Sequence, residues 1–273
     1  MTDYELIDAG GGARLERFGD RLVDRPSPAG LGPRLDPDAW AAADLFFDPD
    51  EGWRGPGPTE PWPIELDGVV LELRPTSTGQ VGVFPEQSSS WAWLRDQVDG
   101  TDATVLDLFA YTGASTLVLA QAGAAVTHVD ASRPAVAWAR RNAELSGLGD
   151  RSIRWIVDDA RAYAAREVRR GRSYDGVLLD PPTYGHGARN RTWQLAADLP
   201  ALLADVAMLV RDRDGFVLLT AHTPGYGPGE LASALGEALG ADRSSLDSGD
   251  LTLTARSGRM LDLGAFARRG RQR

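Results

Sequence analysis

The sequence predicts an α/β fold built on a mostly parallel sheet, and three apolar segments carry that prediction. Residues 105–108, 125–129 and 176–179 are short apolar runs, and each contains or leads into an acidic residue. Helix-like segments separate the runs, and runs of this kind are typical of strands buried on both faces of a parallel sheet. Because the carboxyl ends of parallel strands meet at one edge, ligand-binding residues are expected at that edge.

Residues 1–90 are a different kind of sequence, rich in proline, glycine and acidic residues, and they predict a small β-rich appendage. The elements expected there are two strands within 15–23 that turn at Gly19-Asp20, a short helix or strand within 40–47, an ordered loop over 48–63, and a hairpin over 64–73 that turns at Asp67-Gly68. The chain is therefore predicted to divide into an acidic appendage over residues 1–90 and a second domain over residues 91–273.

The second domain is predicted to alternate strands with helices. Ser132 can cap a helix that carries Pro134 in its first turn and stops at Gly147. The other expected elements are helices over 90–98, 115–121, 195–210 and 231–239, a basic helix beginning near Arg161, strands over 153–157 and 215–220, and a closing hairpin over 251–256 and 259–266.

The loop after the first strand has the features of a nucleotide-type site. Gly113 allows close approach of the backbone, and Asp130 ends the next strand about twenty residues after the turn, where a ribose-binding carboxylate belongs. The loop lacks a full G-x-G-x-x-G, so a dinucleotide fits poorly. Two strand-end acids around a glycine loop suit S-adenosylmethionine better, and the alternative is an ordinary βαβ unit with incidental acids.

The third strand runs into Asp180-Pro181-Pro182. Proline fixes the backbone angle φ and has no N–H, so the loop is expected to be rigid, with carbonyls able to accept hydrogen bonds. A carboxylate beside carbonyl groups that accept hydrogen bonds could orient a substrate amine or hydroxyl that is to be methylated.

Five segments carry a resemblance to a known family. They are Val83-Phe-Pro-Glu-Gln87, Leu106-Asp-Leu-Phe-Ala-Tyr-Thr-Gly-Ala-Ser115, Val129-Asp-Ala-Ser132, Asp158-Asp-Ala160 and Leu179-Asp-Pro-Pro182. The chain resembles the class I S-adenosylmethionine-dependent methyltransferases, and within them the bacterial large-subunit ribosomal-RNA enzymes of the RlmI/RlmK type. The resemblance implies a Rossmann-like sheet of seven strands, mostly parallel with an antiparallel last strand.

The resemblance also implies roles for individual residues. The cofactor-binding residues would be Phe84, Gln87, Asp107, Phe109, Tyr111, Gly113, Asp130, Ala131, Ser132, Asp159 and Ala160, with S-adenosyl-L-methionine as the cofactor. The catalytic residues would be Asp180, Pro181, Pro182 and Tyr184. Two assignments have plainer alternatives, because Gln87 also suits a linker turn and Asp159 also suits a helix N-terminus. Amine methyltransferases usually place an aromatic residue directly after the two prolines, whereas Thr183 intervenes here.

The charge distribution bears on the partner. The net charge is −10, and residues 1–90 hold 17 acidic residues and 7 arginines, so this part accounts for the whole excess. A balance of this sign argues against nonspecific nucleic-acid binding. Arg189 and Arg191, in a glycine-rich stretch after the two prolines, are the candidates for a substrate phosphate or carboxylate.

Composition excludes several classes of protein. The 273 residues include no cysteine, so disulfides, thiolate metal sites and cysteine nucleophiles are absent. The three histidines lack metal-like spacing, and no metal site is expected. No run of 18 apolar residues and no signal-peptide pattern occurs, so a cytoplasmic protein without membrane contact is expected. The sequence does not determine the oligomeric state.

Two functions remain after these exclusions. The resemblance favours a methyltransferase that acts on RNA, at an rRNA-type nucleobase. The charge distribution favours a methyltransferase of the same fold that acts on a small molecule or a protein. A third reading, a cofactor-binding scaffold without activity, would be excluded by any methylation in a broad substrate panel.

Overall fold

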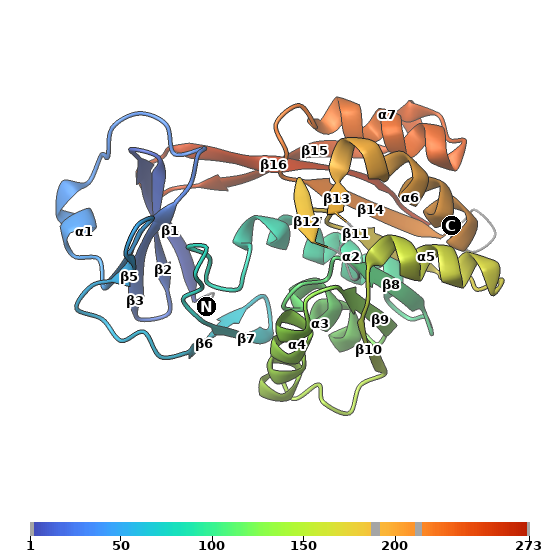
Figure 1. Cartoon of the computed structure of the whole chain (residues 1–273), viewed down its shortest axis with the longest axis horizontal. Coiled ribbons are helices and arrows are strands. Elements are labelled where there is room, and N and C mark those ends of the chain that lie inside the picture. Colours follow the sequence, from blue (N-terminus) through green and yellow to red (C-terminus); the bar gives the residue numbers. More distant parts are fainter. Residues whose placement is uncertain (1–2, 187–191, 211–214, 272–273) are drawn as a thin grey trace. The chain divides into compact units, whose positions relative to one another are not determined.

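The computed structural model describes residues 3–186, 192–210 and 215–271 (Figure 1). The chain forms two compact units. Unit 1 comprises Met1–Ser88 and Thr252–Leu263, and unit 2 comprises Ser89–Leu251 and Gly264–Arg273. The sequence predicted one boundary, at residue 90, and the return of Thr252–Leu263 to unit 1 was not anticipated.

Unit 1 is built from β-strands, as the sequence predicted. One sheet has five strands in the order β1-β2-β3-β4-β5, and a separate hairpin pairs β6 with β7. The strands are β1 (Tyr4–Gly10), β2 (Ala13–Phe18), β3 (Arg21–Pro26), β4 (Leu45–Asp48), β5 (Gly52–Arg54), β6 (Trp62–Leu66) and β7 (Val69–Leu73). Asp67 and Gly68 turn the hairpin with φ angles of 52° and 84°, the left-handed values that a two-residue hairpin turn requires.

Two details of unit 1 refine the predictions. The segment within residues 40–47, predicted as a short helix or a strand, contains the end of helix α1 (Pro37–Ala41) and most of strand β4. Asp36 caps α1, since its side chain accepts the Ala39 N–H. The prediction of an ordered loop over residues 48–63 was wrong at β5, which pairs antiparallel with β4. Proline and glycine on both sides of Gly52–Arg54 hid that short strand.

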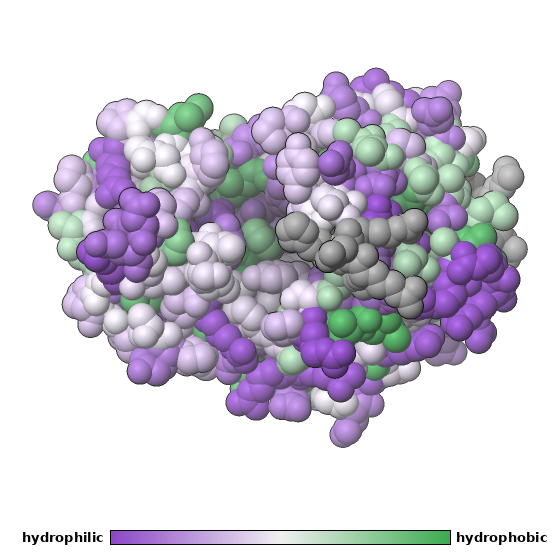
Figure 2. Space-filling view, in the orientation of Figure 1, coloured by the Kyte–Doolittle hydropathy of each residue, from purple (hydrophilic) through white to green (hydrophobic). Residues whose placement is uncertain are grey.

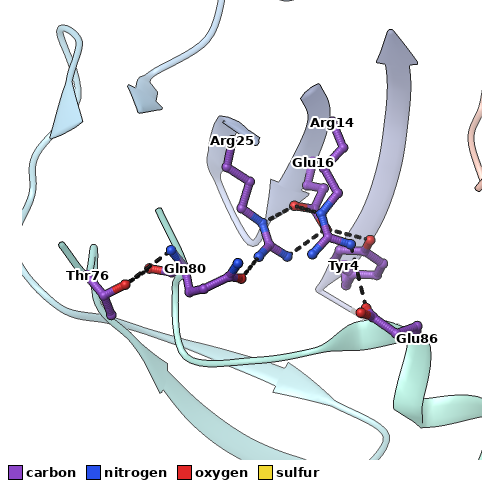
Figure 3. Close-up of polar contacts among 7 residues, drawn as sticks. All are labelled: Tyr4, Arg14, Glu16, Arg25, Thr76, Gln80 and Glu86. Carbon is purple, nitrogen blue, oxygen red and sulfur yellow. Dashed lines mark hydrogen bonds and ion pairs between the residues drawn. The ribbon is translucent and has the colours of Figure 1, made fainter. Parts of the chain in front are cut away.

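A network of buried charges crosses the sheet of unit 1 (Figure 3). Glu16 on β2 is fully buried and receives hydrogen bonds from Arg25 on β3 and from the Tyr4 hydroxyl, which is 2.8 Å away. Arg14 lies between Glu16, 3.4 Å away, and Glu86, 3.6 Å away. Since a buried charge without its partner is costly, removal of one member should destabilise the fold by about 3–5 kcal/mol.

The C-terminal part of unit 1 completes its packing. Leu6 and Ala9 on β1 form a buried cluster with Ala255 and Leu261. The Arg259 guanidinium donates to the main-chain carbonyls of Ala9, Leu31 and Pro33. The returning segment is therefore an integral part of the core of unit 1.

Unit 2 contains the seven-stranded sheet that the sequence predicted, in the order β10-β9-β8-β11-β14-β16-β15. The five strands from β10 to β14 in this order pair in parallel, and β16 is antiparallel to β14. The strands are β8 (Thr104–Leu108), β9 (Ala125–Asp130), β10 (Ile153–Val157), β11 (Gly176–Leu179), β14 (Phe216–Ala221), β15 (Asp247–Thr254) and β16 (Met260–Arg269). Strands β15 and β16 continue into unit 1.

Helices cover both faces of this sheet. They are α2 (Trp91–Val98), α3 (Ala114–Gln121), α4 (Arg133–Leu145), α5 (Ala160–Arg169), α6 (Leu195–Leu209) and α7 (Pro228–Leu239). The 3₁₀ helix η1 (Pro85–Ser90) precedes α2 and runs across the boundary between the two units. The core between the sheet and α5, α6 and α7 includes Val177 and Val217. Side chains alternate along a strand, so Phe216 points to the other face, where it meets Trp93 of α2 at 5.9 Å between ring centroids.

The surface in Figure 2 is largely polar, with small and separate hydrophobic patches. None of the helices in the described part of the chain has the length and apolar character that a membrane span requires. Three of the five tryptophans in the first 93 residues, Trp40, Trp62 and Trp91, are buried and serve as core.

Candidate active site

The loop between β8 and α3 has an unusual backbone. Phe109 and Tyr111 have φ angles of 59° and 47°, and such angles in residues other than glycine cost on the order of 1–3 kcal/mol each. The Tyr111 N–H donates to Asp130 Oδ2 at 2.9 Å, which helps to hold the loop. Gly113 has a φ of 87°, and a Cβ there would lie 2.9 Å from the Ala139 Cβ of α4. Only glycine therefore allows this loop and α4 to pack closely.

Asp107, the acid within β8, is buried and linked to two further side chains. The Thr116 hydroxyl donates to Asp107 Oδ2 at 2.6 Å and lies 2.9 Å from His128 Nδ1. A hydroxyl has one proton, so Thr116 accepts from a protonated Nδ1 of His128. Burial lowers the pKa of His128 to about 3 and keeps the ring neutral. Burial, with smaller contributions from the charges of Asp180 and Asp130, raises the pKa of Asp107 to about 7.

Asp130, the acid at the end of β9, has both carboxylate oxygens oriented by the backbone. Oδ2 accepts the Tyr111 N–H and Oδ1 accepts the Ser132 N–H, 2.8 Å away. Burial raises the pKa of this carboxyl, and the two N–H groups oppose that shift. Ser132 also caps α4 by accepting the Ala135 N–H, as the sequence predicted. Ala131 lies between the two residues and follows directly from the strand.

Asp159 and Ala160 begin α5. Asp159 is the N-cap, and its Oδ1 accepts from the backbone N–H groups of Arg161 and Ala162. Arg161 also pairs with Asp159 Oδ2 at 3.2 Å, and this pairing lowers the pKa of Asp159 against the effect of burial. The plainer alternative for this acid, a helix N-terminus, is therefore confirmed. Contact of Asp159 with an adenine amine stays a prediction.

Asp180 leaves β11 at the same edge of the sheet and meets two side chains from the end of β14. The Thr220 hydroxyl donates to Asp180 Oδ1 at 2.6 Å, and His222 Nε2 lies 3.2 Å from the same oxygen. The charges of Asp180 and Asp130 both act on Asp107, so the three carboxylates share one region. This edge is suited to a positively charged ligand.

The two prolines lead to residues that differ in exposure. The Pro182 carbonyl accepts a hydrogen bond from Trp193 Nε1 at 2.6 Å, so one of the carbonyls predicted to aim at the acceptor has a partner within the fold. Tyr184, on the short strand β12 (Tyr184–His186), is 71% exposed. Such exposure leaves its ring available for contact with a substrate.

Trp193 lies beside several of these residues and was not among the predicted ones. It is buried on β13 (Thr192–Gln194), which pairs with β12. Its ring lies 4.9 Å from the Phe109 ring, and the Arg161 guanidinium is 5.4 Å from its centre. Trp193 thus connects the β8–α3 loop, the start of α5 and the Pro182 carbonyl. A lone tryptophan after a glycine-rich stretch was the only signal in the sequence.

Four predicted residues are not placed with this group. Phe84 and Gln87 belong to unit 1, where the Gln87 N–H donates to the Phe84 carbonyl at the start of η1, and their contact with a cofactor stays a prediction. Arg189 and Arg191 lie outside the described residues. The described residues contain no cluster of three or more histidine and acidic side chains that could hold a metal ion.

The comparisons with known proteins agree with this geometry. A family model described as S-adenosylmethionine-dependent methyltransferase matches residues 44–237. A SAM-dependent methyltransferase from Agrobacterium tumefaciens is similar over 99% of this chain and 91% of its own, with 38% identity and a TM-score of 0.92. A candidate methyltransferase solved in complex with SAH has the same fold, with 17% identity, a TM-score of 0.77, and coverage of 98% of this chain and 75% of its own.

A curated relative is similar over a shorter segment. It is the ribosomal RNA large subunit methyltransferase K/L of Methylococcus capsulatus, which is 38% identical over 111 residues, or 40% of this chain. The matched segment spans 15% of the length of that relative.

Proposed function

This chain belongs to the S-adenosylmethionine-dependent methyltransferase family, and we propose that it methylates a nucleobase of RNA. The observation that carries the proposal is the position of Asp180-Pro181-Pro182, at the exit of a central strand beside Asp107 and Asp130. In an open α/β sheet this edge is where ligands bind, which supports Asp107 and Asp130 as residues that would hold the cofactor and Asp180 as the residue that would meet the acceptor.

The residues at this edge fit the cofactor. Asp130 would accept the ribose hydroxyls, and the backbone of the β8–α3 loop would approach the methionine part at Gly113. Asp107, Asp130 and Asp180 surround a region where positive charge is favoured, and S-adenosylmethionine carries a sulfonium and an ammonium group. When bound, the cofactor supplies an electrophilic methyl group on that sulfonium. Ala131, Asp159 and Ala160 would complete the pocket, as the family resemblance implies.

Asp180 and the two prolines would bind and orient the methyl acceptor. A carboxylate held on one side by Thr220 and His222 can orient an amine or hydroxyl through hydrogen bonds, with the Pro181 carbonyl as a second acceptor. Methyl transfer requires in-line placement of the acceptor, and orientation of this kind can lower the barrier by several kcal/mol. Tyr184, exposed on β12, would form one wall beside the acceptor base.

The similarity to an rRNA methyltransferase supports RNA as the substrate. The charge distribution supports the other candidate, a small molecule or a protein, because the acidic excess of −10 lies in residues 1–90. If RNA is bound, arginines must supply the phosphate contacts, and Arg189 and Arg191 are the candidates that follow Asp180 in sequence.

A salt titration separates the two candidates. Methylation of unmodified ribosomal RNA transcripts by wild-type protein, measured with labelled cofactor, should fall steeply between about 50 and 200 mM salt if several phosphates are contacted. The double variant Arg189→Ala, Arg191→Ala should bind RNA more weakly, and cofactor binding should be unchanged. Absence of RNA methylation at low salt would refute the RNA proposal. Nearly constant turnover of a small molecule or protein across that range would support the alternative.

A further inference from the structure

His222 is a histidine at the acceptor side of the site to which the family assignment gives no role. It follows directly after β14, and its Nε2 lies 3.2 Å from Asp180 Oδ1. The His222 and Asp180 side chains are 30% and 33% exposed, so the pair is reachable from outside yet partly withdrawn from water. At this distance the contact is a hydrogen bond whenever Nε2 carries a proton.

The surroundings hold the imidazole in this orientation. Gly264 on β16 has a φ of 144°, and a Cβ at that position would lie 3.0 Å from His222 Nδ1, so the absence of a side chain leaves room for the ring. Behind Asp180, the Thr220 hydroxyl fixes the same carboxylate oxygen. The Thr183 and Thr223 hydroxyls are 2.7 Å apart and join the two loops that carry Asp180 and His222.

The charges near the pair change during the reaction. The acidic groups at this edge are Asp180 after β11, Asp107 on β8 and Asp130 on β9, and Tyr226 is the other titratable side chain on the loop of His222. Before transfer the sulfonium offsets part of this negative charge. After transfer the cofactor is a neutral thioether, and a positive charge elsewhere at the edge would compensate for the loss.

We propose that His222 is the proton-accepting partner of Asp180 and that the enzyme therefore acts on an acceptor atom that carries a proton. The acceptor nitrogen or oxygen gives its lone pair to the methyl carbon while the carbon–sulfur bond breaks and its electron pair stays on sulfur. The proton of the acceptor atom passes to Asp180 and then to Nε2 of neutral His222. The product state holds an imidazolium beside the Asp180 carboxylate, and the total charge of the site is unchanged.

This inference rests on the proposed methyl transfer, but one test of it needs no acceptor. The three histidines can be distinguished by NMR of the ring nitrogens, with a His222→Gln variant to assign the signal. The neutral ring should carry its proton on Nδ1 and take up the second on Nε2. Its titration midpoint should be higher with S-adenosylhomocysteine than with S-adenosylmethionine, on the order of one pH unit, because the sulfonium disfavours a second cation. Asp180→Asn should lower both midpoints. Equal midpoints in the two complexes would overturn the proposal.

Activity gives the second test. With unmodified ribosomal RNA transcripts, His222→Ala should lower turnover by roughly 10²-fold with little change in KM, as expected when a group that accepts a proton is lost. Added imidazole should restore part of that turnover. Thr223→Val is the matched control, since it removes the hydroxyl pair between the loops without removing a base, and imidazole should not affect it. Turnover of His222→Ala within twofold of wild type, or no response to imidazole, would contradict the role of His222. If wild-type protein leaves these transcripts unmethylated, the RNA proposal fails, and the NMR titration still decides the role of His222.

Discussion

Cofactor affinity should depend on pH through Asp107. Burial, reinforced by the charges of Asp180 and Asp130, raises the pKa of this carboxyl to about 7. The carboxyl is therefore mostly protonated at pH 6 and mostly ionised at pH 8. If the ionised form is the one that receives the positively charged cofactor, affinity should increase as pH rises through 7 and level off above it.

The size of the pH effect on cofactor affinity follows from the fraction of Asp107 that is ionised. With a pKa near 7, about one tenth of the carboxyl is ionised at pH 6 and about nine tenths at pH 8, so the Kd for S-adenosylmethionine should be about tenfold weaker at pH 6. That difference corresponds to about 1.4 kcal/mol of binding free energy. Binding near pH 6.5 should also release a proton, which calorimetry detects as a dependence of the apparent enthalpy on the buffer.

Asp107→Asn is the control for this prediction. An amide keeps the size of the side chain and can still accept the Thr116 hydrogen bond, but it does not titrate. The variant should bind more weakly at pH 8 and show little change between pH 6 and pH 8. Equal wild-type affinities at the two pH values, or an unchanged slope in the variant, would show that Asp107 is not the titrating group.

Three further predictions concern the carboxylates. The pKa of Asp107 is higher in the folded than in the unfolded state, so ionisation of this carboxyl lowers the stability of the fold as pH rises from about 4 to 7. Asp107→Asn removes the ionisation, and in denaturation scans the variant should lose less thermal stability than wild type across that pH range. Asp130→Ala should weaken S-adenosylmethionine binding in calorimetry, and unchanged binding would remove Asp130 from the site. Asp180→Ala should lower turnover roughly 10²-fold while leaving cofactor affinity nearly intact, and surviving turnover would mean that the acceptor lies elsewhere.

The sequence predicted the fold where the apolar pattern was continuous. The parallel strands and the capped helix α4 occur within a few residues of the expected bounds, because buried strands and N-caps depend on local sequence. The strand β5 and the β12–β13 pair were missed, because glycine and proline around short strands resemble loops. Both pairs join neighbouring strands of only three or four residues, which are too short for an alternating pattern to be recognised.

The positions of three acidic residues of the candidate site were predictable for the same reason. Asp107, Asp130 and Asp180 lie at or near the ends of predicted parallel strands, and the topology of a parallel sheet brings such ends together at one edge. Trp193 was not recognised as part of the site and no role was assigned to His222, since each makes its contacts through tertiary structure and follows no local motif. The N-cap role of Asp159 was visible in the sequence, whereas a role in cofactor binding depends on the ligand and stays a prediction.

The path of the chain through unit 1 has a practical consequence for dissecting the protein. A fragment cut after Ser88 would lose β1 to β7 but retain Thr252–Leu263, whose apolar residues Ala255 and Leu261 normally pack on Leu6 and Ala9. Without these partners, the end of the β15–β16 hairpin would expose unpaired strand edges, which promote aggregation. A short turn joining Leu251 directly to Gly264, which lie on neighbouring strands, would remove it. Unit 2 is therefore better isolated by excising an insertion than by truncating one end.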